Sequence, residues 1–167
     1  MKETVKLQNR SERNRQEVIN VMNYMINPVL MGGLVKEVTA DVVKVHLHGR
    51  LGVITVPKSM ILDPVVPEPG HEMQFYFSYL QVNETPYDYD GSPISRDREF
   101  APCLLGGTIT EVNDTAIKAD IMEHMGTVAV PRRWVFTDLA LKEGQNVEFY
   151  FSPMHVSGKR DIPIESI

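Results

Sequence analysis

Residues 28–82 read PVLMGGLVKEVTADVVKVHLHGRLGVITVPKSMILDPVVPEPGHEMQFYFSYLQV, and a related sequence returns 74 positions later as residues 102–156. Aligned without a gap, the two stretches are identical at 16 of 55 positions. The longest identical run, Phe-Tyr-Phe-Ser, occupies residues 75–78 and 149–152. A repeat of this length is too long for a solenoid unit and suits a small folding module. The sequence therefore predicts an internal duplication in which each copy closes its own core.

The repeat divides the chain of 167 residues into an N-terminal segment, 1–27, a first copy, 28–100, and a second copy, 101–167. Residues 11–26 lack Gly and Pro, begin with a Ser that can cap a helix, and place apolar side chains on one helical face. Asn27-Pro28 ends this pattern, because proline disfavours helical geometry in the residue before it. We expect an amphipathic N-terminal α-helix that either covers the core or binds a partner protein or a second copy of the chain.

Apolar and polar residues alternate along most of each copy, as they do in strands that are half buried against a core. The fourth alternating segment changes parity near Ser78-Tyr79, which indicates a β-bulge. Five short strands per copy predict a mainly β protein that forms two small five-stranded barrels. The predicted strands of the first copy are residues 34–38, 43–48, 53–57, 72–82 and 93–96, and the fifth strand of the second copy is predicted at 163–165.

The order of these features resembles the RNA-binding repeat of the large ribosomal protein S-one, a five-stranded OB-fold. In the first copy the residues that match are Gly33–Val38, Val45–Leu47, Gly52–Ser59, Gly70, Met73–Phe75 and Ile94–Arg96. In the second copy they are Gly107–Val112, Gly126–Pro131, Leu141–Gly144 and Val147–Phe149. The resemblance implies two tandem OB-like barrels after the N-terminal helix, with single-stranded RNA as the partner.

That family contacts RNA bases through outward residues of strands two and three, typically an aromatic residue and a histidine. Here the second-strand positions hold Lys44 and Lys118, and the third-strand positions hold Thr55 and Ala129. A lysine can contact a phosphate but gives no platform for stacking, which costs about 1–3 kcal/mol per base. Lys44 and Lys118 are therefore predicted to bind the RNA backbone.

Other candidate contacts combine positive charge with aromatic rings. Arg132 and Arg133 precede Trp134, and such a group can touch single-stranded nucleic acid, although an equally good interpretation places Trp134 in the core. Tyr76 and Tyr150 are expected to face outward between buried phenylalanines, where each either stacks on a base or packs against the sister barrel. A further candidate contact is Arg96, in the predicted last strand of the first copy.

Composition narrows the class of protein. Hydrophobic residues make up 43% and charged residues 23%, with a net charge of -5. There is no apolar run of roughly 20 residues and no apolar core of a signal peptide, so we expect a cytoplasmic protein without a membrane segment. Cys103, the single cysteine, cannot form an internal disulfide and is predicted to be a small core residue. His46 and His48 share a strand face without a third ligand, so neither a metal nor a cofactor is expected.

The sequence shows no paired acids, no nucleophile with its base and no phosphate-cradling glycine loop, so we do not expect an enzyme. The leading hypothesis is a non-catalytic RNA-binding protein associated with translation or RNA metabolism. The alternative is a protein-interaction or assembly module without nucleic-acid binding, which would use Met22 and Met25 of the N-terminal helix and the acidic loop 84–90. The two hypotheses differ in whether the few basic residues gather on one face or an apolar patch is left uncovered.

Overall fold

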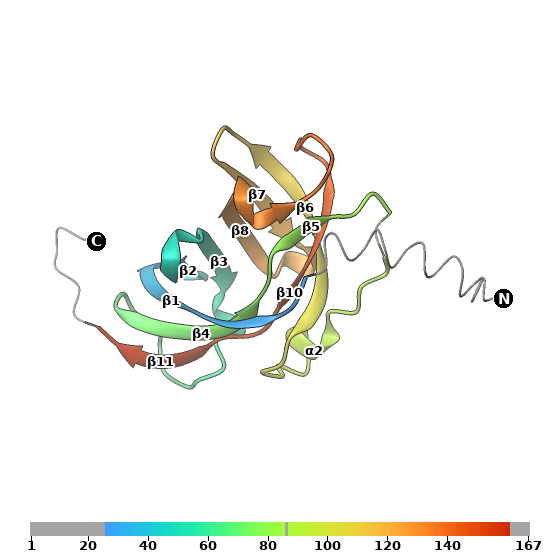
Figure 1. Cartoon of the computed structure of the whole chain (residues 1–167). Helices are drawn as coiled ribbons and strands as arrows, with labels where there is room; N and C mark the ends of the chain where they lie inside the picture. The colour runs from blue at the N-terminus through green and yellow to red at the C-terminus, as the bar shows by residue number, and fades with distance from the viewer. Residues whose placement is uncertain (1–25, 86, 161–167) are drawn as a thin grey trace.

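A computed structural model describes residues 26–85 and 87–160 of the chain. The N-terminal helix expected up to residue 26 and the strand expected at 163–165 fall on residues outside this description, apart from Ile26. The described chain is mainly β, as the sequence predicts, and its strands join into one 11-stranded sheet (Figure 1).

The strands of the two halves follow one another in the same order. The first half contributes β1 (Val29–Val38), β2 (Val42–Leu47), β3 (Val53–Pro57), β4 (His71–Phe77) and β5 (Leu80–Val82). The second half contributes β6 (Cys103–Val112), β7 (Ala116–Ile121), β8 (Gly126–Pro131), β9 (Val135–Phe136), β10 (Asn146–Phe151) and β11 (His155–Lys159). Short turns of helix lie between them: η1 (His48–Arg50), η2 (Lys58–Met60), α2 (Ser92–Ser95), η3 (Met122–His124) and η4 (Arg132–Trp134).

The first three predicted strands, residues 34–38, 43–48 and 53–57, are confirmed, and the halves agree in detail. In the pairing of β1 with β2 the register shifts between Val35 and Glu37, and in the pairing of β6 with β7 it shifts between Ile109 and Glu111. Each of these positions lies 74 residues from its counterpart. The alternation of the sequence is also observed, because successive residues of β2 are alternately half buried and buried.

The fourth segment differs from the prediction, because the chain leaves its own half at Ser78-Tyr79. Strand β4 ends at Phe77, and β5 pairs with β10 of the second half. In return, β11 at the end of the second half pairs with β4 of the first, and Figure 1 shows β11 running beside β4. The single bulged strand predicted at 72–82 is therefore wrong: its first part pairs mainly with β1 of its own half, its second part pairs with β10 and β9 of the other half, and the halves exchange their last strands.

Two serines join β4 and β10 where these strands of the two halves cross. The backbone N–H of Tyr76 donates to Ser152 Oγ over 2.8 Å, and the backbone N–H of Tyr150 donates to Ser78 Oγ over 2.9 Å. Both serines are buried, and each hydroxyl donates in turn to the carbonyl of the next residue. The repeated Phe-Tyr-Phe-Ser sequence thus supplies both sides of a reciprocal crossing.

The strand predicted at 93–96 is also wrong, because Ser92–Ser95 form the short helix α2. Asp90 Oδ1 accepts a hydrogen bond from the backbone N–H of Ser92 over 3.0 Å, which satisfies a free amide at the start of the turn. Pro93 stands in the first turn, where a helix needs no N–H donor. Local capping at this point outweighs the apolar alternation that suggested a strand.

The buried side chains of both halves form one cluster, so the prediction of a separate core for each copy is wrong. Its centre is the ring group Phe75, Phe77, Phe149 and Phe151, each fully buried, with centroids 5.9–6.4 Å apart. The exchange of last strands explains this, because β4 and β10 meet at the Phe77–Phe151 pair and carry their inward side chains into a shared interior.

The halves also join through β3 and β8, which pair antiparallel from Val53–Ala129 to Thr55–Thr127. The approach is close at two glycines with positive φ, Gly52 (111°) and Gly126 (121°). A Cβ atom on Gly52 would lie 1.9 Å from the carbonyl oxygen of Ala129, and one on Gly126 would lie 2.2 Å from that of Thr55. Only glycine fits either position, and this seam creates one continuous outer face.

Candidate nucleic-acid interface

The outer face of the sheet runs over β2, β3, β8 and β7, and it carries both predicted lysines. Lys44 on β2 lies in the row that continues through Thr55 and Thr127. Lys118 on β7 lies in the neighbouring row, opposite Ala129. Three strand spacings separate the two lysines, which places them roughly 15 Å apart. Asp120 lies opposite Thr127 at the far end of the Lys44 row and shares the outer face of β7 with Lys118. Each flank of the face therefore carries one lysine, and the β7 flank also carries a carboxylate.

Lys44 has basic neighbours on its side of the face. Burial of the ring lowers the pKa of His46, and the charges of Lys36 and Lys44 lower it further. His46 is therefore neutral near pH 7 and adds no charge there. The prediction that His46 and His48 share a strand face is wrong, because β2 ends at Leu47 and His48 begins the turn η1.

Three arginines gather at one end of this face, and we call Arg50, Arg132 and Arg133 the arginine corner. Arg133 Nη2 donates to the carbonyl oxygen of Arg50 over 3.3 Å, which brings η4 against η1 across the seam. Arg132 Nη1 donates to the carbonyl oxygen of Asn113 over 2.7 Å, and its backbone N–H donates to Thr115 over 3.0 Å. The corner is thus built from both halves of the chain.

The charges of the arginine corner are not neutralised nearby. Within the described ranges 26–85 and 87–160, none of the three arginines forms an ion pair with a carboxylate. Their known partners are neutral carbonyl oxygens, and the side chains of Arg50 and Arg133 are exposed. Such guanidinium groups keep donors free for phosphate or carboxylate oxygens.

A shallow depression of about 400 Å³ adjoins the arginine corner, and we call it the outer hollow. It lies over the first residues of β3 and β7 and the last residues of β8. Its lining is mainly small and apolar, with Arg133 at the rim: Gly52, Val53, Thr115, Ala116, Ala129, Val130, Pro131 and Arg133.

The structure places Trp134 in a stack of rings. The ring centroids of Trp134 and Tyr79 lie 3.8 Å apart, and the two ring planes make an angle of 17°. Tyr79 stacks in turn on Phe136, with ring centroids 4.4 Å apart. Trp134 Nε1 donates to the carbonyl oxygen of Ser78 over 3.0 Å. Trp134 also packs against the core, so of the two interpretations of this residue the structure favours the packing one.

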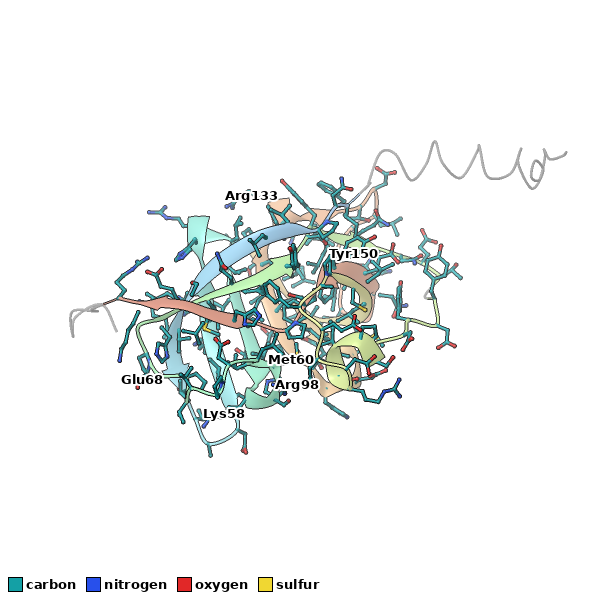
Figure 2. All side chains as sticks on the ribbon, turned by 90° about the horizontal axis from the view of Figure 1, so that it is seen from below. Lys58, Met60, Glu68, Arg98, Arg133 and Tyr150 are labelled. Atoms are coloured by element: carbon teal, nitrogen blue, oxygen red, sulfur yellow. The ribbon has the colours of Figure 1, made fainter. Side chains whose placement is uncertain are left out.

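The two tyrosines between the phenylalanines have different surroundings. Tyr76 is half buried and its ring packs on Phe100, with centroids 5.4 Å apart. Tyr150 is half buried at the position opposite Leu104 on β6 (Figure 2). Neither belongs to β2, β3, β8 or β7, so the structure does not bring them to the outer face.

Arg96 also lies apart from the arginine corner. It follows α2 and is exposed, and its Nε makes an ion pair of 3.4 Å with Asp97. The neighbouring Asp90 also feels its charge, since hydrogen bonds from Ser92, with a smaller contribution from Arg96, lower the pKa of that carboxyl. The structure therefore groups Lys44, Lys118, Arg132 and Arg133 on or beside one face, and leaves Arg96 outside it.

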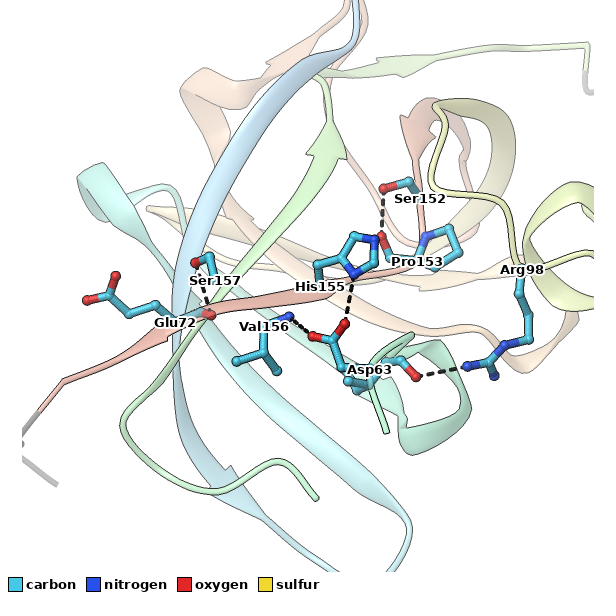
Figure 3. A network of polar contacts seen from close by, with 9 residues as sticks. Asp63, Glu72, Arg98, Ser152, Pro153, His155, Val156 and Ser157 are labelled. Carbon is cyan, nitrogen blue, oxygen red and sulfur yellow. Dashed lines mark hydrogen bonds and ion pairs between the residues drawn. The ribbon is translucent and has the colours of Figure 1, made fainter. Parts of the chain in front are cut away.

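A polar cluster fastens the exchanged strand β11 to the first half, as Figure 3 shows. Asp63 Oδ1 lies 2.9 Å from His155 Nδ1, and Asp63 Oδ2 accepts the backbone N–H of Val156. Burial raises the pKa of Asp63, but the hydrogen bonds from His155 and Val156 outweigh it, and the net pKa is lowered. No nucleophile bonds to His155 among the described residues, and the cluster acts as a fastening.

The acidic loop predicted at 84–90 is anchored rather than fully solvated. The hydroxyl of Tyr89 donates a hydrogen bond of 2.6 Å to Glu148. The side-chain amides of Asn83 and Gln81 donate to the same buried carboxylate. Burial and the bond to Glu148 raise the pKa of Tyr89 to about 12. Tyr89 therefore ties this part of the loop to Glu148 of β10.

Among the described residues no three His, Cys, Asp or Glu side chains lie close enough to hold a metal ion. Cys103 is half buried and free, and burial, followed by nearby carboxylates, raises the pKa of its thiol. That shift disfavours the reactive thiolate. In the part of the chain that the structure covers, no helix has the length and apolar character needed to cross a bilayer.

The residue that the sequence did not indicate is Arg50. Its counterpart 74 positions later is His124, so the repeat draws no attention to it. Arg50 has a positive φ of 58° in the turn η1, a conformation that a sequence pattern does not reveal in an arginine. Only the seam between β3 and β8 brings this turn against Arg133.

Comparison with known proteins gives little guidance. The chain matches no protein-family model, and no curated protein is similar to it. Among solved structures it is similar to the cytoplasmic molybdate-binding protein ModG in a form with molybdate bound, at 16% identity over 75% of this chain and 92% of that chain. The TM-score of 0.24 supports no statement on the fold or ligand of this chain.

Proposed function

We propose that this protein is a non-catalytic RNA-binding protein that holds single-stranded RNA on the outer face of β2, β3, β8 and β7. The observation that carries the proposal is the arginine corner, three arginines without a carboxylate partner in the described chain, beside a face that also holds Lys44 and Lys118. Lysine and arginine supply the phosphate contacts that dominate the affinity of proteins for nucleic acid.

The proposed contacts are to the RNA backbone for the most part. The ring of Trp134 is stacked on Tyr79, and the ring of Tyr76 packs on Phe100, so neither offers an open platform at this face. Binding of this kind depends strongly on salt and tolerates changes of base sequence. The associated role would be in translation or RNA metabolism, in the cytoplasm, where a single reduced cysteine is usual.

The proposal includes the origin of the fold. We infer that the two halves descend from one duplicated OB-like unit of the S-one type, whose last strand has been exchanged between the copies. The equal register shifts at Val35 and Ile109 and the reciprocal serines Ser78 and Ser152 support this inference.

A second candidate function, a protein-interaction or assembly module, rests on a different observation. Val29 and Leu30 at the start of β1 are 55% and 47% exposed, and apolar neighbours of this kind can mark a protein contact. The segment expected to form the N-terminal helix directly precedes them in the sequence. A concentration-dependent increase in molar mass by light scattering, lost on Leu30→Lys, would favour this candidate.

Fluorescence anisotropy with labelled single-stranded RNA and DNA, at about 50 and 200 mM salt, tests the RNA proposal. The informative variant is Lys44→Glu/Lys118→Glu, which reverses charge on both flanks of the outer face. Its matched control is Arg96→Glu/Lys142→Glu, which makes the same charge change at exposed positions outside this face. We expect binding that salt weakens and that only the first variant abolishes. Flat titrations of the unmodified protein would refute the proposal.

A further inference from the structure

Where the outer hollow lies on the described outer face, the side chains are small and apolar and not merely uncharged. The residues that point outward there are Val53, Ala116, Ala129 and Pro131, with Gly52 beside them. Lys118 stands in the same row, opposite Ala129. A planar apolar group can therefore lie against the sheet at this point, with cationic side chains within reach on several sides.

The hollow is made by the seam between the halves. Val53 comes from β3 of the first half and Ala129 from β8 of the second, and these residues are direct partners in the ladder. Gly52 allows the close approach, because a Cβ atom there would collide with the carbonyl oxygen of Ala129. A single unit of the repeat does not contain this hollow.

Arginines stand in and next to the lining of the hollow. Arg133 lines the hollow and is tied to the carbonyl of Arg50, next to Gly52. Arg132 follows Pro131 of the lining and is held by the carbonyls of Asn113 and Thr115, of which Thr115 lines the hollow. A small apolar depression beside guanidinium groups that have no carboxylate partner in the described chain matches one nucleotide, whose base is flat and apolar on its faces and whose phosphates are anionic.

We propose that the outer hollow seats one unpaired base of the bound RNA. The guanidinium plane of Arg133 covers the base, and Arg50 and Arg132 hold the phosphates on either side of it. This inference rests on the proposed function and adds a base contact to a surface otherwise based on phosphates. Arginine stacks on bases as it does on aromatic rings, so the contact tolerates any base.

The equivalent position in the other half lacks the residues that would seat a base. Where the hollow has Ala116, Ala129 and Arg133, the residues 74 positions earlier are Val42, Thr55 and Ser59. The depression beside Gly126 and Thr127 at that end, about 280 Å³, has Asp120 and His124 in its lining and no arginine. The structure accordingly assigns one base site per chain, and not two.

The test compares two labelled ten-nucleotide probes that carry the same phosphates, an oligouridylate and an abasic RNA. The unmodified protein should bind the oligouridylate at least about fivefold more tightly, the lower range for stacking one base. Ala129→Leu fills the hollow and should remove that preference, while binding of the abasic probe and its salt dependence stay the same. Thr55→Leu, the matched substitution in the other half, should keep the preference.

A second variant guards against misfolding of Ala129→Leu. Ala116→Val/Ala129→Thr introduces the residues that the first half carries at Val42 and Thr55, so the strands accept them, and it should also remove the preference. An unchanged preference in this variant would overturn the base site while leaving RNA binding intact, as would equal binding of the two probes by the unmodified protein. If neither probe binds, the proposed function and the base site both fail.

Discussion

The two ends of the β3–β8 seam have equivalent backbone positions but differ in their charged side chains. At one end stand Arg50, Arg132 and Arg133, and the residues at the equivalent positions of the other end are His124, Lys58 and Ser59. Figure 2 labels Arg133 and Lys58 on opposite sides of the molecule in that view. One end therefore concentrates three guanidinium groups, whereas the other has a single permanent cation.

What the halves share is the set of residues that the backbone requires, and what they do not share is the surface. Gly52 and Gly126 both keep a positive φ at the seam, and Ser78 and Ser152 both cap a crossing strand. The side chains that face solvent at the seam have diverged. A site on only one end is the expected result when packing constrains both halves and ligand binding constrains one.

The largest effect is expected where the halves are most alike. Gly52→Ala and Gly126→Ala should each destabilise the fold by about 3–5 kcal/mol, since each adds a Cβ atom against a backbone oxygen at positive φ. Gly144→Ala is the matched control: φ is 92° there, but nothing lies within 4 Å of the added atom, so about 1 kcal/mol is expected. Urea denaturation measures all three, and similar losses for all would contradict a close seam.

The next effect should appear where the halves differ. Arg50→Gln/Arg132→Gln should weaken RNA binding roughly 30-fold, taking about 1 kcal/mol for each lost phosphate contact. The slope of log affinity against log salt should fall by about 1.4, because two single-strand phosphate contacts are lost. Lys58→Gln/Lys142→Gln removes the same charge elsewhere and should change neither quantity. Equal losses in both variants would mean that net charge, and not the arginine corner, determines affinity.

The crossing serines offer a test of equivalence between the halves. Ser78→Ala and Ser152→Ala should each cost about 1–3 kcal/mol of unfolding free energy, because each leaves the backbone amide of a half-buried tyrosine without its acceptor. Denaturation of Ser59→Ala, an exposed position, supplies the baseline. A loss confined to one crossing would show that the two strand exchanges are not equivalent in stability.

The sequence predicted the local parts of this fold well, because alternation and turn glycines depend on neighbours in the chain. Strands β1 to β3 follow from the period of two. The exchange of β5 and β11 does not follow from this period, because the segments that contain Leu80 and His155 show the same alternation whichever strand they pair with. The repeat even favours closed copies, since it shows which residues correspond but not which half each strand pairs with.

The candidate site divides in the same way. Lys44 and Lys118 were predicted from their strand positions, and the structure places both on one outer face. Arg50 and the outer hollow were not predicted, since both arise from contact between segments some 80 residues apart in the sequence. Trp134 looked like a binding residue because it follows two arginines, but its partner Tyr79 comes from the exchanged segment.

The smallest effect concerns how each exchanged strand is fastened. Strand β11 is held by Asp63, whose pKa is lowered by His155 and Val156 against the effect of burial, whereas β5 is held by the Gln81–Glu148 contact. A lowered pKa in the folded state stabilises the protein above the unfolded value near 3.8, and this contribution is lost as pH falls through the folded pKa. Because the side chains of Asp63 and His155 are partly exposed, Asp63→Asn should cost only about 0.5–1 kcal/mol of unfolding free energy at pH 7.

Denaturation from pH 7 to pH 3 should show the stability difference between the unmodified protein and Asp63→Asn holding down to about pH 5 and shrinking below pH 4. A difference that persists unchanged at pH 3 would mean that the shape of the side chain, and not its charge, fastens β11.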